Sequence, residues 1–259
     1  MRKRIYALCL RHLYPLRRDF DLLSDMIYWP IIDVLLWGIT SQWLSNSTEV
    51  SAISSAILIG LIFWNIIWRS QSEVSRNLIE EIWNNNLVNL FSTPITLIEW
   101  ILGALLLSLI KMSLTITVII PFIFLMYSIN VFTLGWNLIP FFICLVMTGW
   151  WVGFISAGVV LRHGPKVQTV VWTLPGILLP FSAVFFPLAL LPAALQPIAR
   201  VLPTTYIFEA MRSLVNTGSF DWSAVFISMT LNILYLGLAL LWFTKSFHKS
   251  LQLGLGRFN

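Results

Sequence analysis

The chain has 259 residues, of which 58% are hydrophobic and only 10% are charged, and its mean hydropathy is +0.84. One soluble core cannot enclose that share of apolar side chains, so the composition excludes an ordinary soluble domain and indicates a protein whose solvent is lipid. The two cysteines, Cys9 and Cys144, fall on an N-terminal segment and within an apolar stretch, and no Cys/His spacing is typical of a metal site. Neither a disulfide framework nor a bound metal is predicted.

Residues 1–25 are predicted to form an amphipathic helix that lies in the membrane interface. Apolar residues recur on one broad helical face, while Arg4, Arg11 and Arg18 lie on the opposite side, and Pro15 predicts a bend. The segment has no early apolar core followed by a small-residue cleavage site, so no cleaved signal peptide is expected. A simpler alternative is that its cations only retain the N-terminus on one side of the membrane.

Six later stretches are long and apolar enough to cross about 30 Å of hydrocarbon as helices, which satisfy their own backbone hydrogen bonds. They are residues 26–44, 53–69, 100–127, 137–161, 168–187 and 222–244. The predicted fold class is therefore an all-α integral membrane protein with six transmembrane helices in residues 26–259.

Lys and Arg residues are divided unequally between the two sides that these spans create. The side that holds both termini collects most of them, including Arg69 and Arg76 in a predicted loop, whereas the other side holds only Arg200 and Arg212. The link 45–52 has no cation. Because cationic loops are retained in the cytoplasm, both termini are predicted to be cytoplasmic. The net charge of +5 then reflects topology and gives no reason to predict nucleic-acid binding.

The stretch between the second and third spans is unusually polar. Over residues 76–91, apolar residues recur at intervals of three and four while Asn and Glu fill the opposite face, which predicts an amphipathic helix too polar to enter lipid. Pro94 ends this helix. Thr96 and Glu99, three residues apart, predict a capping box that starts the third span. The segment is thus predicted to be a helix, a rigid corner and a span.

Most of the 12 prolines lie between residues 165 and 203. Interrupted helix at membrane depth is tolerated only where it packs against protein or lines a cavity, so the fifth span is predicted not to traverse as a simple rod. Residues 188–220 are predicted to form short external or re-entrant helices. The last of these places Glu209 and Arg212 on one face, and Asp221 is predicted to cap the sixth span.

Two runs resemble the type-2 ABC exporter permease family. The first, "NNNLVNLFSTPITLIEWILG", is similar to the cytoplasmic hallmark of the family, and the residues that match are Leu87, Leu90, Ser92, Thr93, Pro94, Ile95, Glu99 and Gly103. The second, "LPTTYIFEAMRSLVNTG", is similar to the element that precedes the last span. Where the family often has Gly-Thr before the first Leu, this chain has Asn85-Asn86.

The resemblance implies a transport subunit of the bacterial cytoplasmic (inner) membrane that exports a lipid, a lipid-linked glycan or a drug-like substrate. It implies a homodimer of permeases, and it makes residues 76–91 the coupling helix that docks into a separate nucleotide-binding ATPase subunit. The chain contains no Gly-rich phosphate loop, so ATP and Mg are expected on that partner, and no cofactor is expected on this chain. It would not be an enzyme.

Two functions of other classes stay open at this point. One is an integral membrane enzyme that acts on lipid-linked substrates, although the chain has no HExxH or GxSxG motif. The other is a membrane scaffold without a transport role. Co-purification with an ATPase, with stimulated hydrolysis, would separate the permease from both.

An exposed aromatic residue flanked by charge suits the anchor and rim of a protein interface, which favours Glu80, Glu81 and Trp83 as contacts for the ATPase. The alternative is a solvated acidic face. The full set predicted for ATPase coupling is Glu80, Glu81, Trp83, Leu87, Leu90, Pro94 and Glu99.

Asp33 and Lys111 are ionisable residues inside predicted spans, where charge usually faces a bundle interior or a cavity. One hypothesis is that they pair with each other; a structural ion pair or separate snorkelling is the alternative to a transport role. Gly149 and Gly153 allow close approach of two helices, with packing inside the chain favoured over dimerisation. Trp residues near span ends are predicted to be interface anchors, with a stacking pathway for substrate as the alternative.

Overall fold

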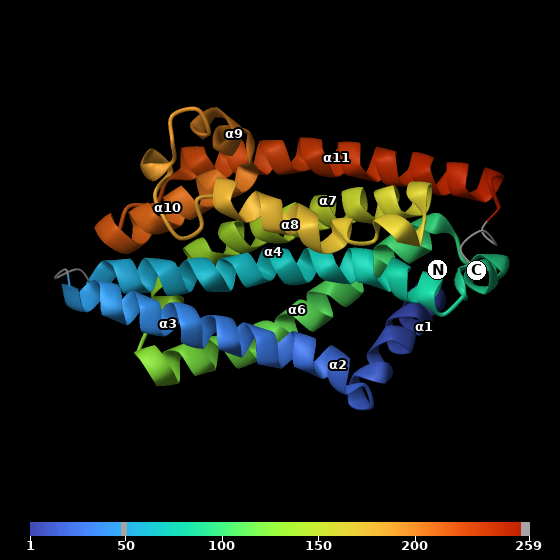
Figure 1. Cartoon of the computed structure of the whole chain (residues 1–259), viewed down its shortest axis with the longest axis horizontal. Helices are drawn as coiled ribbons and strands as arrows, with labels where there is room; N and C mark the ends of the chain where they lie inside the picture. The colour runs from blue at the N-terminus through green and yellow to red at the C-terminus, as the bar shows by residue number, and fades with distance from the viewer. Residues whose placement is uncertain (48–50, 255–259) are drawn as a thin grey trace.

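The computed structural model describes residues 1–47 and 51–254, and all of its regular elements there are helical, which confirms the all-α class (Figure 1). The α-helices are α1 (Arg2–Leu13), α2 (Phe20–Leu23), α3 (Trp29–Ser47), α4 (Ser51–Trp83), α5 (Leu87–Ser92), α6 (Leu97–Tyr127), α7 (Leu138–His163), α8 (Val170–Phe181), α9 (Gln196–Val201), α10 (Pro203–Thr217) and α11 (Trp222–Gln252). Short 3-10 or π turns are η1 (Pro15–Arg17), η2 (Ser24–Tyr28), η3 (Val131–Asn137), η4 (Pro165–Val167) and η5 (Leu188–Leu190).

Four helical stretches among the described residues are long and apolar enough to cross a membrane, so the chain is a multi-pass membrane protein. They are Phe20–Trp43, Leu97–Tyr127, Val131–His163 and Trp222–Gln252, and they correspond to the first, third, fourth and sixth predicted spans. The predicted count of six is not confirmed, because α4 and α8 fall outside this group. The link 45–52 lies partly outside the described residues.

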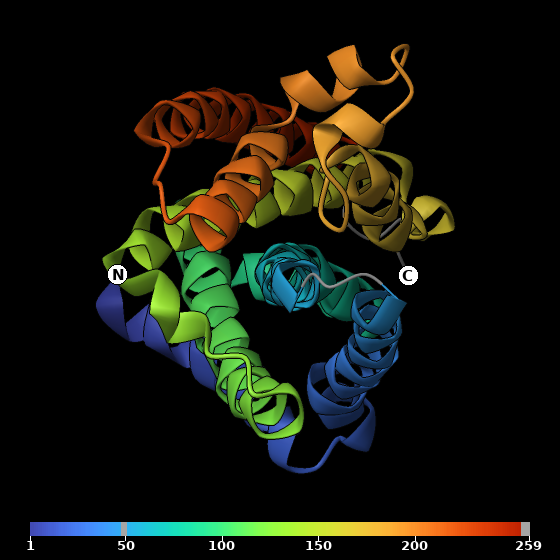
Figure 2. The ribbon, with the colours of Figure 1, turned by 90° about the vertical axis from the view of Figure 1, so that its left-hand side faces the viewer.

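α4 is the central helix of the bundle. Viewed along the long axis, it is surrounded by α3, α6, α7, α8 and α10, and it contacts each of them (Figure 2). Nearly all of its side chains from Ile57 to Ile82 are buried. A helix enclosed by protein need not be apolar all round, which is why α4 holds polar residues that a lipid-facing helix would exclude.

Close packing of α7 against α4 depends on two glycines. A Cβ atom on Gly149 would lie 2.5 Å from Cβ of Ser70, and one on Gly153 would lie 2.8 Å from Cβ of Val74. The GxxxG pair therefore serves packing within the chain, because its face is already covered by α4.

The fifth predicted span, residues 168–187, is only partly helical. α8 has 12 residues and ends at Phe181, and the chain then turns through Ala183, whose φ is 53°, before η5, α9 and α10. These short elements lie at the end of the bundle opposite α1 (Figure 1). Asp221 caps α11 as predicted, because its side chain accepts a hydrogen bond from the backbone N–H of Ala224 at 3.1 Å.

The N-terminal segment differs from one bent helix over residues 1–25. α1 ends at Leu13 and a 3-10 turn begins at Pro15; Asp19 then caps α2 by accepting hydrogen bonds from two backbone N–H groups. From Phe20 the chain is helical through η2 into α3 up to Trp43. The predicted boundary between residues 25 and 26 thus falls inside one helical stretch.

Candidate coupling site

The predicted helix over residues 76–91 is wrong in its boundaries, because two helices meet there. α4 continues without interruption to Trp83, and α5 begins at Leu87 after a turn in which Asn85 has a φ of 50°. Asn adopts this left-handed conformation more readily than most residues other than Gly. Asn85 can therefore adopt the left-handed conformation of this turn, which a glycine would also adopt without strain.

The apolar face of this stretch is covered by protein. Leu78, Ile79 and Ile82 of α4, together with Leu87 and Leu90 of α5, are at most 3% exposed and share one core cluster with α6 and α7. The apolar side of the α4 part therefore packs into the bundle, and neither the membrane surface nor a partner covers it.

The corner between α5 and α6 has the predicted capping box. Thr96 Oγ1 accepts from the Glu99 N–H at 3.3 Å, and the Thr96 N–H donates to Glu99 Oε2 at 3.0 Å. Just before it, Arg4 of α1 donates a hydrogen bond to the carbonyl oxygen of Pro94. Two backbone N–H groups and one backbone carbonyl near the start of α6 gain hydrogen-bond partners in this way. These bonds fix the geometry of the corner.

α1 binds two carboxylates of this region, and we call the resulting contacts the α1 latch, defined by Arg4, Arg11, Glu81 and Glu99. Glu81 accepts from Arg11 at 2.8 Å, and Glu99 accepts from Arg4 at 3.3 Å. The amide of Asn86 also donates to Glu81, at 2.6 Å. Glu81 and Glu99 are 1% and 4% exposed. Both predicted ATPase contacts are therefore buried and bonded to residues of the same chain.

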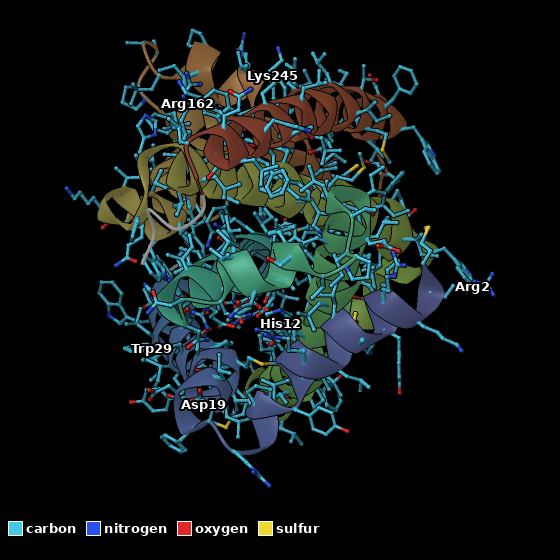
Figure 3. The ribbon with its side chains drawn as sticks, turned by 90° about the vertical axis from the view of Figure 1, so that its right-hand side faces the viewer. Arg2, His12, Asp19, Trp29, Arg162 and Lys245 are labelled. Atoms are coloured by element: carbon cyan, nitrogen blue, oxygen red, sulfur yellow. The ribbon has the colours of Figure 1, made fainter. Side chains whose placement is uncertain are left out.

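Glu80 lies beside the latch and faces α1. His12 points from α1 toward the end of α4 (Figure 3), and its Nδ1 is 3.6 Å from Glu80 Oε2. Burial raises the pKa of the Glu80 carboxyl, but the His12 side chain and the positive charges of Lys111 and Arg76 outweigh it, so the pKa lies below its ordinary value. Glu80 is therefore held in its ionised form.

The exposed part of the site is small and mostly uncharged. Trp83 is 53% exposed, and its indole N–H donates to Oε1 of Gln168 at 2.8 Å, which ties the end of α4 to the segment before α8. Beyond it, Asn84, Asn89 and Pro94 are exposed on the turn, on α5 and at the corner. We call this surface, from Trp83 to Pro94, the corner surface. Of the residues predicted for ATPase coupling, only Trp83 and Pro94 are exposed on it.

A second polar cluster lies deeper along α4. This α4 charge network consists of Asp25, Arg69, Glu73, Arg76 and Lys111. Lys111 of α6 is 2.6 Å from Glu73, while Asp25 of η2 is 2.7 Å from Arg69 and 2.9 Å from Arg76. Arg69, Glu73 and Lys111 are each at most 2% exposed. The network connects η2, α4 and α6 through ion pairs that protein encloses.

The hypothesis that Asp33 pairs with Lys111 is wrong, because Lys111 is bonded to Glu73. The predicted loop with Arg69 and Arg76 is wrong as well, since both lie within α4. Sequence reasoning missed Glu73, although Arg69 and Glu73 stand four residues apart directly after an apolar run. That spacing is a signal for a charged face continuing the same helix.

Glu209 and Arg212 form the predicted i, i+3 contact on α10, at 2.7 Å. Glu209 also accepts from the backbone N–H of Leu188 at 2.7 Å, and Arg212 donates to the carbonyl of Val184 at 3.3 Å. The pair therefore fastens the segment after α8 to α10.

Long apolar helices, an enclosed polar helix and a capped corner between two of the helices define a multi-pass membrane protein with an ordered surface at one end. The model of the family described as ABC-2 type transporter matches residues 20–216, which is most of the chain, and the chain therefore belongs to this family. It is a membrane permease, the transport subunit of such a transporter. No curated protein matches it.

Proposed function

We propose that this permease is an exporter subunit that moves a lipid, a lipid-linked glycan or a drug-like molecule out of a bacterial cytoplasm. A separate ATPase subunit would bind ATP and Mg and supply the energy, and two copies of the permease would form a homodimer in the inner membrane. The observation that carries the proposal is the corner surface, which is joined to α4 by a short turn and to α6 by a capping box.

The distribution of cations supports the proposed orientation. The end of the bundle at which α1 lies displays Arg2, Arg162 and Lys245 around its rim (Figure 3). Because cations near span ends are retained in the cytoplasm, this end is assigned to the cytoplasmic side. The corner surface then faces the compartment that contains ATP.

The contacts of the site supply a path for force. An ATPase that pressed on the corner surface would move α5, whose neighbours α4 and α6 are joined by the Glu73–Lys111 pair at 2.6 Å. α1 fastens the same corner through the α1 latch. A rigid-body shift of packed helices is an ordinary mode of conformational change, and it needs such fixed connections.

The test is ATP hydrolysis by the permease co-expressed with the ATPase encoded nearest to its gene and reconstituted in lipid. Trp83→Ala removes the exposed aromatic residue of the corner surface, and truncation of an interface anchor costs more than about 1 kcal/mol, or more than about fivefold in affinity for the ATPase. Trp136→Ala is the matched control, because Trp136 is 86% exposed and lies in η3, which the 31-residue α6 separates from the corner.

We expect Trp83→Ala to weaken binding of the ATPase and to reduce permease-dependent hydrolysis, while Trp136→Ala leaves both unchanged. Hydrolysis that does not depend on the permease would favour a membrane scaffold instead. Equal effects of the two substitutions would mean that the corner surface is not the docking site.

A further inference from the structure

A cavity of about 320 Å³ lies beside the α4 charge network. It is formed between η2, α3 and α4, and its lining includes Asp25, Trp29, Asp33, Trp64, Trp68 and Arg69. Its size falls at the lower end of the range typical of small-molecule sites, about 300 to 1,000 Å³. It can hold a headgroup or a small organic ion, and its lining decides which.

Two of the three charged residues in the lining pair with each other, and Asp25 also pairs with Arg76, outside the lining, at 2.9 Å. Arg69 donates to the Asp25 carboxylate at 2.7 Å and to its backbone carbonyl at 2.6 Å, so both terminal nitrogens of the guanidinium are occupied. Asp33 has no ion pair or hydrogen bond with any side chain in residues 1–47 and 51–254. A carboxylate inside a span without a direct partner is unfavourable, so Asp33 is the charged group of the lining that would gain most from a bound cation.

The aromatic residues define the kind of cation that would balance this charge. Trp64 and Trp68 stand four residues apart on α4, and Trp29 stands four residues before Asp33 on α3, so each helix presents its contributions on one face. Indole is the best of the side-chain rings for attracting a cation to its face. A small metal ion needs several oxygen ligands, whereas an alkylated ammonium group is satisfied by one carboxylate and aromatic faces.

We propose that this cavity binds the ammonium group of an organic cation, either a soluble amine or the headgroup of a lipid. Asp33 supplies the counter-charge and the three Trp side chains supply the indole faces; Asp33 and Trp29, which is 59% exposed, lie on the open side of the cavity. The statement that this cation is the exported cargo rests on the proposed function above, while the binding itself does not.

The experiment compares two isosteric probes, choline and 3,3-dimethylbutanol, in which carbon replaces the ammonium nitrogen. Each is titrated by calorimetry into the full-length protein held in phosphatidylglycerol nanodiscs. We expect choline to bind at least about tenfold more tightly, because only the cation gains from Asp33 and the indole faces. Equal binding of the two probes, or no binding of choline, would overturn the proposal.

Substitutions assign the effect to the cavity. Asp33→Asn should weaken choline binding about tenfold or more, Asp33→Glu by less than about threefold, and Trp29→Ala by about fivefold. Asp21→Asn is the matched control, because Asp21 is exposed and lies outside the cavity lining. Unfolding temperatures confirm that the variants are folded. Unchanged choline affinity in folded Asp33→Asn would contradict the assignment.

The lipid around the protein identifies the source of the cation. If phosphatidylethanolamine added to the nanodiscs competes with choline, the ligand is a lipid headgroup; if choline affinity stays unchanged, the ligand is a soluble amine. No ATPase or nucleotide is present in these titrations. A failure of the ATPase test would therefore leave their result intact, and a failure here would leave the coupling role of the corner surface untouched.

Discussion

The two halves of α4 are equally buried but are buried by different chemistry. From Ile57 to Ile67 its side chains are almost all apolar and pack in one core cluster with aromatic residues such as Phe141 and Phe208. From Arg69 to Glu81 most of the buried side chains are polar or charged. The first half gains from any well-fitting apolar neighbour, whereas the second requires particular partners at hydrogen-bond distance.

The two halves of α4 therefore contribute differently to the stability of the fold and to the relative positions of its helices. An apolar core tolerates exchanges of similar volume, so it fixes the helices only loosely in register. A buried ion pair contributes little net stability compared with a hydrophobic pair, but its loss on one side leaves an uncompensated charge. We expect the polar half, which lies next to the corner surface, to set the position of α4 relative to α1, η2 and α6.

The largest effect is expected from breaking the Glu73–Lys111 pair. Lys111→Met leaves the Glu73 carboxylate buried, with the Arg69 guanidinium 4.0 Å away. Removing one partner of a buried pair costs roughly 3–5 kcal/mol, while replacing both by apolar residues is often neutral. The double variant Glu73→Met/Lys111→Met should therefore recover most of the loss. Thermal unfolding in detergent measures both, and a double variant as unstable as the single one would contradict the account.

The next effect tests how closely α7 packs on the polar half. Gly149→Ala places a methyl group 2.5 Å from Cβ of Ser70 and 2.7 Å from the carbonyl of Ile67, and overpacking of this kind costs roughly 1–3 kcal/mol. Gly176→Ala in α8 is the control, since no atom lies within 4 Å of the added Cβ and alanine favours helix. Unfolding temperatures should fall for the first variant and stay level or rise for the second.

A smaller effect is expected at the corner. Thr96→Ala removes the side-chain acceptor of the capping box, which costs about 1 kcal/mol at a helix start. Thr117→Ala on the same helix is the control, because Thr117 is exposed and its hydroxyl donates to the Ser113 carbonyl of its own helix. If the corner transmits force, Thr96→Ala should also lower permease-dependent ATP hydrolysis in the reconstituted complex. Equal permease-dependent ATP hydrolysis by the two variants would mean that the Thr96 cap takes no part in coupling.

Local features could be predicted from the sequence because they depend on residues a few positions apart. The Thr96–Glu99 box, the break at Pro94 and the Asp221 cap all belong to this kind. The partners of Glu99 and Glu81 could not be predicted, since Arg4 lies 95 residues from the first and Arg11 lies 70 residues from the second. Opposite charge alone does not say which of several cations in a chain will reach a given carboxylate.

The burial of α4 by other helices of the same chain could not be predicted from hydropathy. An amphipathic pattern shows that one face is covered, but it does not say whether lipid, a partner or the same chain covers it. Leu78 and Ile82 belong to the predicted amphipathic helix over residues 76–91, and the structure buries them against α6 and α7. A polar run such as Arg69 to Arg76 marks the end of a span only when the helix leaves the protein interior there.

The smallest effect distinguishes the α1 latch from ordinary surface charge. Arg11→Ala removes a cation 2.8 Å from the buried Glu81, whereas Arg2, which projects away from the bundle in Figure 3, is the control. A partly exposed ion pair contributes about 0.5–1 kcal/mol, so amide hydrogen exchange in Arg2–Leu13 should accelerate by roughly two- to fivefold in the Arg11 variant. Exchange should be unchanged in Arg2→Ala. Equal acceleration in both would mean that α1 is held by general attraction to the surface. Acceleration in Arg11→Ala alone would mean that a specific contact joins α1 to the end of α4.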